Sequence, residues 1–320
     1  MKSLKWMVPL LLLLGVVWWV VAQGHPKGRV FLTFDDGPIN ATHDVLDVLK
    51  AAGVKATFFI NSYHLEGPQG SPVDRADDAL RRIIAEGHVL ANHSHDHMLH
   101  SNTPFDPQRI VVDTYGEPEQ ELPYFGARVV GPVRQVLGEL YQAQNNRLNY
   151  MVRLPYSNNW RLPDLVIDCP CCTLDEINPQ MIVSPTGSCK RMSQSAHNAV
   201  RLADHFAENH MEVFGWDVDW GPTDWTAARV SETLQGVEAL VAQIEAVLDG
   251  DACATDDYLI TVPCQAPPRD GKVIVLTHDF LFEDGYRGRG KQVNLPKLAR
   301  LIETLRARGH RLDTLDRYLE

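Results

Sequence analysis

The chain has no internal repeat, no low-complexity tract and no Pro/Ser-rich linker. These absences argue against a repeat protein and against two domains joined by a flexible tether. A length of 320 residues suits one large domain, and single α/β barrels commonly reach this size. We therefore expect residues 25–320 to form one domain.

Positive charge is scarce, because 30 Lys and Arg residues face 41 Asp and Glu residues, a formal net charge of -11. This balance argues against nucleic acid and against an anionic membrane surface as partners. It fits a neutral or cationic ligand. Hydrophobic residues make up 44% of the chain, so a sizeable core can form.

Long hydrophobic runs are absent after residue 22, but one precedes it. Lys2 and Lys5 stand before an apolar run over residues 6–22 that ends in the small residue Ala22. A positive start, an apolar stretch and a small final residue are typical of a secretory signal, and a run of this length can also remain as a membrane anchor. Residues 1–24 are therefore predicted to be a signal peptide or an N-terminal anchor. The protein is expected to be secreted or periplasmic, with membrane contact only through this segment.

Cysteine is also scarce, with six residues in two groups. An even number of cysteines in an exported chain favours disulfides. The short separation of Cys253 and Cys264 suggests one bridge, whereas the connectivity of the other four stays open. A metal site is the alternative for the "CPCC" stretch, but no histidine lies nearby at zinc-finger spacing. The first group is Cys169, Cys171, Cys172 and Cys189.

Short apolar runs alternate with helical patterns along most of the chain. Unbroken apolar runs are typical of parallel strands buried on both faces. Alternation of strand and helix predicts an α/β fold, with a barrel as its natural closure. The predicted strands are 29–34, 55–60, 88–92, 150–154, 211–216, 272–277 and 310–313, and the predicted helices are 41–52, 77–86, 193–209, 229–249 and 294–308. Residues 101–128 and 155–192, rich in Pro, Asn and Gly, are predicted to be long binding loops.

Polar residues that can carry chemistry follow five of the predicted strands. The active site of a barrel lies at the carboxyl ends of its strands, so we expect these residues to converge. They are Asp35-Asp36, His93 to His97, Arg153 to Tyr156, Asp217 to Trp220, and His278-Asp279.

His93 and His97 are four residues apart, so a helical turn after the strand would project both rings to one side. Two imidazoles and one carboxylate leave coordination positions open, as in a catalytic rather than a structural zinc site. His95, between them, is expected to point elsewhere. We therefore predict one divalent metal ion at this strand end, and we expect it to be Zn²⁺.

Asp35 and Asp36 place two like charges side by side at the edge of a core, which costs free energy unless something offsets them. A bound cation provides that offset. Consecutive residues point in different directions, so one aspartate can bind the metal while the other acts as a base. Phosphatases of the haloacid dehalogenase type are an alternative, but their D-x-D-G spacing differs and they need no histidine pair.

Other strand-end residues complete the predicted site. His278 could donate a proton to a leaving group, with Asp217 or Asp219 orienting it, and Arg153 could pair with the base aspartate. Tryptophans near the predicted rim suit sugar rings, which stack on flat apolar faces. The candidates for substrate binding are Trp160, Trp220 and Trp225, with Trp216 beside them.

Five motifs in this order resemble the polysaccharide deacetylases of the NodB-homology group, carbohydrate esterase family 4. They are TFDDGP (33–38), HSHDH (93–97), RLPY (153–156), WDVDWGPTDW (216–225) and VLTHD (275–279). The resemblance covers residues 26–320 and implies a distorted (β/α) barrel. Long loops that carry the cysteines would cover its active-site face.

The resemblance also implies a role for each site residue. Asp36, His93 and His97 would hold the metal, with Asp35 as general base and His278 as general acid. The backbone N–H of Tyr156 would lie in the oxyanion hole. Arg153 would tune Asp35, and Asp217 or Asp219 would support His278.

A narrower resemblance is to the secreted bacterial chitin-oligosaccharide deacetylases. It rests on "THDFLFEDGYRGRG" (277–290), "RLPYSNNWR" and Ser157, which replaces the glycine of generic family members. It implies de-N-acetylation of short chitin oligosaccharides, the disaccharide N,N′-diacetylchitobiose above all. We also expect the protein to be a monomer. The five motifs equally permit a peptidoglycan or acetylxylan deacetylase, and a carbohydrate-binding or sensor protein is the non-enzymatic alternative. Shortened loops after His64 and over 221–230 depart from the family pattern and leave chain-length preference open.

Overall fold

A computed structural model of the chain describes residues 27–66, 75–97, 117–144, 147–167, 194–221, 234–249, 271–284 and 290–320. The predicted leader, all six cysteines and Trp225 lie outside these ranges. Within these ranges, no helix is long and apolar enough to cross a membrane.

One sheet organises the described residues, in the order β6-β5-β7-β4-β3-β2-β1-β9-β8, with β10 also paired to β1. All pairs are parallel except those of β5 with β6 and with β7. The strands are β1 (Arg29–Gly37), β2 (Thr57–Ile60), β3 (Val89–Asn92), β4 (Met151–Val152), β5 (Trp160–Leu162), β6 (Leu165–Ile167), β7 (Glu212–Val213), β8 (Val218–Asp219), β9 (Lys272–His278) and β10 (Arg311–Asp313).

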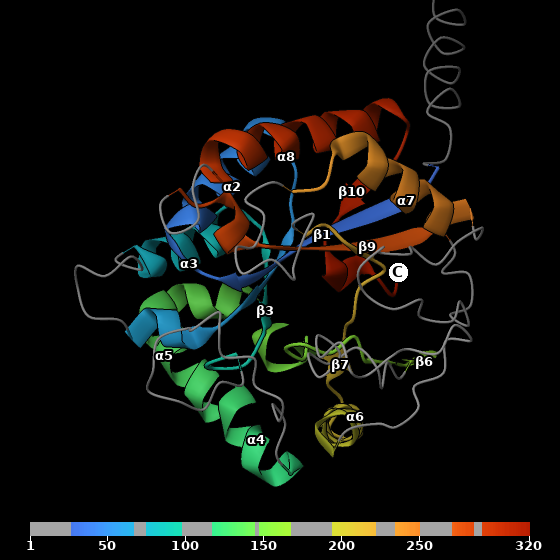
Figure 1. Ribbon diagram of the computed structural model, residues 1–320. Helices are drawn as coiled ribbons and strands as arrows, with labels where there is room; N and C mark the ends of the chain where they lie inside the picture. The colour runs from blue at the N-terminus through green and yellow to red at the C-terminus, as the bar shows by residue number, and fades with distance from the viewer. Residues whose placement is uncertain are drawn as a thin grey trace, which may run out of the picture.

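Helices surround this sheet on the outside, so the architecture is the predicted distorted (β/α) barrel (Figure 1). The helix α8 packs beside α2 and α7, while α4, α5 and α6 lie toward the opposite side of the molecule in that view. The helices are α2 (Asn40–Ala52), α3 (Ala76–Ala85), α4 (Pro118–Phe125), α5 (Ala127–Leu137), α6 (Gln194–Glu208), α7 (Val237–Asp249) and α8 (Gly290–Ala307).

The central strand β1 shows how the sequence divides the core in two. Val30, Leu32 and Phe34 pack in the cluster between the sheet and the helices, whereas Phe31 packs in a second cluster on the other face. Successive side chains of a strand point to opposite faces, so Asp35 falls on the face of Phe31. The strand therefore carries its apolar side chains to both clusters and delivers Asp35 to the inner face.

The predicted strands and helices are all present, with ends shifted by several residues. The largest shift is at 229–249, where α7 begins only at Val237. The prediction of a loop over 101–128 was wrong for its last part, because residues 118–125 form α4. Within the second predicted loop, 155–192, residues 160–167 form the antiparallel β5–β6 pair.

The helix α5 was not predicted, and Pro132 lies inside it although proline normally breaks a helix. A proline in a helix leaves the carbonyl four residues earlier without its N–H donor. Here that carbonyl belongs to Arg128, and it accepts a hydrogen bond of 3.0 Å from the Ser62 hydroxyl. A long-range side-chain contact thus makes the proline tolerable.

Candidate metal centre and active site

The site begins where β1 and β9 end side by side. Asp35 is the register partner of His278 across this parallel pair, and Phe59 of β2 lies opposite Asp35 on the other side. Register partners in a sheet point to the same face. A carboxylate and an imidazole therefore emerge together at the carboxyl edge of the sheet.

Asp36 would point to the other face if β1 continued regularly, but the strand is irregular here. The register with β2 shifts between Asp35 and Gly37, and the backbone of Asp36 is left-handed with φ of 69°. A bulge of this kind re-aims a side chain. The irregularity explains how two consecutive carboxylates can serve one site.

His93 and His97 follow β3, and their rings meet with centroids 5.0 Å apart. The expected helical turn between them was wrong. Residues 93–97 form a non-helical turn in which Ser94 and His97 have positive φ values of 72° and 54°. The side chain of Asn92 shapes it, since its Oδ1 accepts the Ser94 N–H at 2.9 Å.

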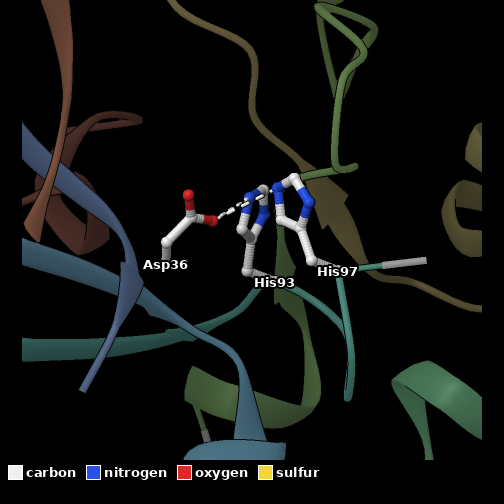
Figure 2. A group of neighbouring side chains, drawn as sticks. All are labelled: Asp36, His93 and His97. Atoms are coloured by element: carbon white, nitrogen blue, oxygen red, sulfur yellow. Dashed lines mark ion pairs between the residues drawn. The ribbon is translucent and has the colours of Figure 1, made fainter. Parts of the chain in front are cut away.

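Asp36, His93 and His97 form a group whose potential ligand atoms all lie within 4.8 Å of one another. Figure 2 shows the Asp36 carboxylate directed at the two imidazoles. Oδ1 of Asp36 lies 3.5 Å from Nε2 of His93 and 3.2 Å from Nε2 of His97. This is the same triad that the sequence predicts as the metal-binding set.

The protonation of these groups fits a cation between them. His93 donates its Nδ1–H to the Arg153 carbonyl at 2.8 Å, so its Nε2 carries a lone pair. Burial lowers the pKa of His93 well below its usual range, and lowers the pKa of His97 to about 4. Within the described residues, Oδ1 of Asp36 accepts no hydrogen bond. Acceptor atoms thus face one another, an arrangement that a divalent cation satisfies and that repels without one.

Arg153 lies fully buried on the inner face of the barrel. Its guanidinium donates to Oδ1 of Asp35 and to the Thr33 hydroxyl, both at 2.8 Å, and to the Gly215 carbonyl at 2.9 Å. It also lies over the Phe59 ring, 4.2 Å from the centroid. Burial raises the pKa of Asp35, and the Arg153 charge opposes that rise. The predicted pairing of Arg153 with Asp35 is present.

The two aspartates predicted as alternative supports of His278 have different neighbours. Oδ2 of Asp217 accepts the backbone N–H of Ile274 at 2.8 Å, near the start of β9. Asp219 is the register partner of Leu276, two residues before His278. Alternate residues share a face, so Asp219 is the nearer of the two to His278 along the sheet.

The tryptophan predictions were wrong for two residues. The Trp160 side chain is 1% exposed and donates its N–H to Asn158, and the Trp220 side chain is 0% exposed and donates to the Gln235 carbonyl. Both rings pack in the core and present no face to a ligand. A tryptophan next to a strand end fills a core as readily as it lines a rim, and sequence spacing does not separate the two.

Two residues that the sequence analysis did not select lie beside the metal triad. The ring of His64 donates its Nε2–H to the Asp36 carbonyl at 2.9 Å, and the ring of Tyr63 lies 4.0 Å from that of His64. Tyr63 is 36% exposed, and desolvation together with the nearby Asp36 charge raises the pKa of its hydroxyl. Tyr156, with φ of 57°, places its ring 4.2 Å from that of His97. Tyr63 therefore offers exposed aromatic surface at this site, and Trp216, placed beside the rim by the sequence, is half-buried with its ring centroid 5.9 Å from the Arg153 guanidinium.

These features are typical of a hydrolase site: a two-histidine, one-carboxylate triad beside a buried carboxyl group and an imidazole at the mouth of an α/β barrel. A family model for polysaccharide deacetylases matches residues 22–115. The chitin disaccharide deacetylase of Vibrio alginolyticus is 36% identical over 335 residues, covering 99% of this chain and 78% of that protein. The chain therefore belongs to the polysaccharide deacetylase family, and the predicted enzyme class, a hydrolase of amide bonds, is confirmed.

Other relatives match over shorter stretches. The peptidoglycan-N-acetylglucosamine deacetylase of Bacillus cereus is 42% identical over 74 residues, covering 23% of this chain and 24% of that protein. The solved chitin deacetylase of Colletotrichum lindemuthianum is 18% identical, with a TM-score of 0.47, over 92% of this chain and 88% of that chain.

Proposed function

We propose that this protein removes the N-acetyl group from chitin oligosaccharides, the disaccharide N,N′-diacetylchitobiose first among them. Water adds to the acetamide carbonyl, the C–N bond breaks, and acetate and a glucosamine unit are released. The observation that supports the reaction best is the register pairing of Asp35 with His278 beside the metal-binding triad. One face of the site thus offers both a proton acceptor and a proton donor.

Asp36, His93 and His97 would hold one divalent cation, Zn²⁺ in our proposal. Bound there, the ion would supply a Lewis acid that polarises the acetamide carbonyl and lowers the pKa of water. Neutral imidazoles are the form that binds metal, and the lowered pKa values of both histidines keep them in that form near neutral pH.

Each remaining residue would act on one proton or one charge. Asp35, held by Arg153 at 2.8 Å, would accept a proton from the attacking water. The backbone N–H of Tyr156 would donate to the oxyanion of the tetrahedral intermediate, a contribution of about 3–4 kcal/mol in comparable sites. His278, with Asp219 near it, would donate a proton to the amine as it leaves. An amine is a poor leaving group without that proton.

The substrate proposal rests on the relative at 36% identity, which is named as a chitin disaccharide deacetylase and spans nearly all of this chain. The net charge of -11 agrees with a neutral oligosaccharide better than with an anionic cell-wall polymer. Deacetylation of peptidoglycan remains the second candidate, because the relative from Bacillus cereus has that activity in its name.

We further propose that the protein acts after export, as a single catalytic domain over residues 25–320. The support is the charged and apolar N-terminal segment, residues 1–24, followed by cysteines suited to an oxidising compartment. Mass spectrometry of the protein recovered from culture fractions would show whether the first 24 residues are removed. Full-length protein in the cytoplasm would contradict this part of the proposal.

Acetate release from N,N′-diacetylchitobiose tests the main proposal. The wild-type protein should release acetate, a chelator should stop the release, and added Zn²⁺ should restore it. Asp35→Asn serves as the inactive control from the same preparation. Acetate released from peptidoglycan fragments or acetylxylan, with none from chitin oligomers of any length, would overturn the substrate assignment.

A further inference from the structure

Asp279 follows the predicted general acid His278 and ends the VLTHD motif, but the mechanism above assigns it no role. Its side chain is fully buried. His278 faces the inside of the barrel, so the next residue along the chain turns toward the helices. There Asp279 meets the end of β1 and the start of α2.

The carboxyl group of Asp279 touches both of these segments. A Cβ atom added at Gly37 would lie only 2.1 Å from Oδ2 of Asp279, so the carboxyl oxygen rests against the Gly37 backbone. The Thr42 hydroxyl donates to the same oxygen. The Thr42 hydroxyl oxygen in turn accepts the N–H of Ile39, the N-cap residue of α2, at 2.9 Å. This N–H has no partner within the helix itself.

The segment that Asp279 contacts is the one that aims the metal ligand. Gly37 directly follows Asp36, whose left-handed backbone re-aims its carboxylate toward the histidines. A non-glycine residue holds such a conformation only when its surroundings impose it, at a cost of roughly 1–3 kcal/mol. Two other contacts assist: the Asn61 N–H donates to the Gly37 carbonyl at 2.8 Å, and His64 donates to the Asp36 carbonyl at 2.9 Å.

We propose that Asp279 is a positioning residue: its carboxyl group, wedged between Gly37 and Thr42, holds the bulge at the end of β1 in the conformation that lets Asp36 bind the metal ion. The hydrogen bond that Asp279 accepts comes from Thr42, which is not one of the three proposed metal ligands. The inference rests on the proposed metal centre, and it predicts an effect on metal affinity that does not depend on the identity of the substrate.

The shape of the carboxyl group, rather than its charge, should carry this role. Burial raises the pKa of Asp279 to about 8, so the group is largely uncharged at neutral pH. Asparagine has the same shape without a charge. Asp279→Asn should therefore preserve the wedge, and Asp279→Ala should remove it.

The test measures Zn²⁺ affinity by competition with a chromophoric chelator, together with kcat, KM and Tm. Replacing a residue that orients a metal ligand typically costs about 10–100-fold in affinity. We expect a loss of that size in Asp279→Ala, recovery to within a few-fold of wild type in Asp279→Asn, and an unchanged KM in both. Asp313→Ala is the matched control, because Asp313 is a buried aspartate paired with Arg29 at the other end of β1. It should lower Tm and leave Zn²⁺ affinity unchanged.

A double-variant cycle tests the contact itself. Gly37→Ala should weaken Zn²⁺ binding in the wild type, because the new methyl group collides with Asp279. In the Asp279→Ala background, Gly37→Ala should lower Zn²⁺ affinity clearly less, because the Asp279 carboxyl group that the methyl group would meet is absent. The inference would be overturned if Asp279→Ala bound Zn²⁺ with wild-type affinity. It would also be overturned if Gly37→Ala lowered Zn²⁺ affinity equally in the wild type and in Asp279→Ala. A protein that binds Zn²⁺ but releases no acetate would instead count against the proposed function alone.

Discussion

Asp35 and Asp36 are neighbours in sequence with the same side chain, yet their surroundings differ. Asp35 is buried and held by Arg153 at 2.8 Å, while Oδ1 of Asp36 faces two imidazole nitrogens and accepts no hydrogen bond from the described residues. An ion pair with arginine keeps a carboxylate charged and fixes its position. A carboxylate oxygen and imidazole lone pairs that face one another repel unless a cation lies between them. The two residues should therefore fail in different ways when they are changed.

Asp36→Ala should abolish Zn²⁺ binding and activity together, because it removes the carboxylate ligand. Asp35→Asn should keep the metal and lose turnover by about 10²–10⁴-fold, the usual contribution of a general base. Metal content by mass spectrometry and kcat on N,N′-diacetylchitobiose, measured on the same samples, separate the two results. Metal loss in Asp35→Asn would contradict the division of roles.

Tyr63 offers exposed aromatic surface beside the triad, where the buried Trp160 and Trp220 offer none. Its ring is tilted against that of His64, with centroids 4.0 Å apart, and His64 donates to the Asp36 carbonyl. Tyr63→Ala should raise KM for the disaccharide about five- to tenfold, roughly 1 kcal/mol, since a stacked face contributes an energy of that size. Steady-state kinetics give the measurement, and Tyr63→Phe, which keeps the ring, is the control. A change confined to kcat would place Tyr63 in the chemical step instead of sugar binding.

At the scale of strands and loops, His88 links the start of β3 to the start of β2. Its Nδ1 accepts the Ala56 N–H at 3.1 Å, and its ring lies edge-on to Phe58. Burial, with the Lys55 charge next in importance, lowers the pKa of His88 to about 4. The folded state therefore holds this imidazole neutral while the unfolded chain takes up a proton below its usual pKa of about 6.5.

The sign of the pH dependence follows from that difference. The contribution of His88 to stability is complete above pH 6.5 and falls as the pH drops toward 4, by about 2 kcal/mol at pH 5. His88→Asn keeps an acceptor for the Ala56 N–H and removes the titration. Urea unfolding at pH 7 and pH 5 should show a smaller loss of unfolding free energy in the variant than in the wild type. Equal losses would mean that His88 is not held neutral.

The sequence alone was sufficient to predict the features that a local residue pattern marks. Uninterrupted apolar runs marked the parallel strands, and the polar residues after them marked the carboxyl edge, where Asp36, His93 and His97 do meet. Features set by distant contacts were missed. The tolerance of Pro132 in α5 depends on Ser62, and the convergence of His93 and His97 depends on a non-helical turn rather than on helical spacing.

The sequence also did not predict which side chains near the site are buried. Trp160 and Trp220 flank the expected rim in sequence, but each lies in an apolar cluster, and local spacing contains no information on which face of the sheet a neighbouring loop returns to. Asp279 illustrates the converse. The sequence shows its position after His278, but its contact with Gly37 joins the residue after β9 to the end of β1, across more than two hundred residues, and exists only in the folded chain.

On the scale of the whole molecule, the two ends of the barrel differ in backbone conformation and in ion pairing. Among the described residues, most non-glycine positions with positive φ lie at the carboxyl end, at Asp36, Ser94, His97 and Tyr156, and His210 before β7 is the exception. The amino end holds partly buried ion pairs such as Arg29–Asp313. Strain that clusters at a site must be offset by the structure around it or by a ligand that binds there. We therefore expect the metal ion proposed for this site to contribute to the stability of the entire barrel as well as to the reaction.

Removal of the metal should lower the thermal stability of the wild-type protein. A ligand that binds only the folded state stabilises it by RT ln(1 + [L]/Kd), about 4 kcal/mol when the free metal concentration is a thousand times Kd. Differential scanning calorimetry should show a Tm that falls on addition of a chelator and returns with excess Zn²⁺. Asp36→Ala, which lacks a ligand, should show one Tm under all three conditions. If chelator lowered the Tm of this variant as much as that of the wild type, the stabilising ion would be bound somewhere other than at Asp36, His93 and His97.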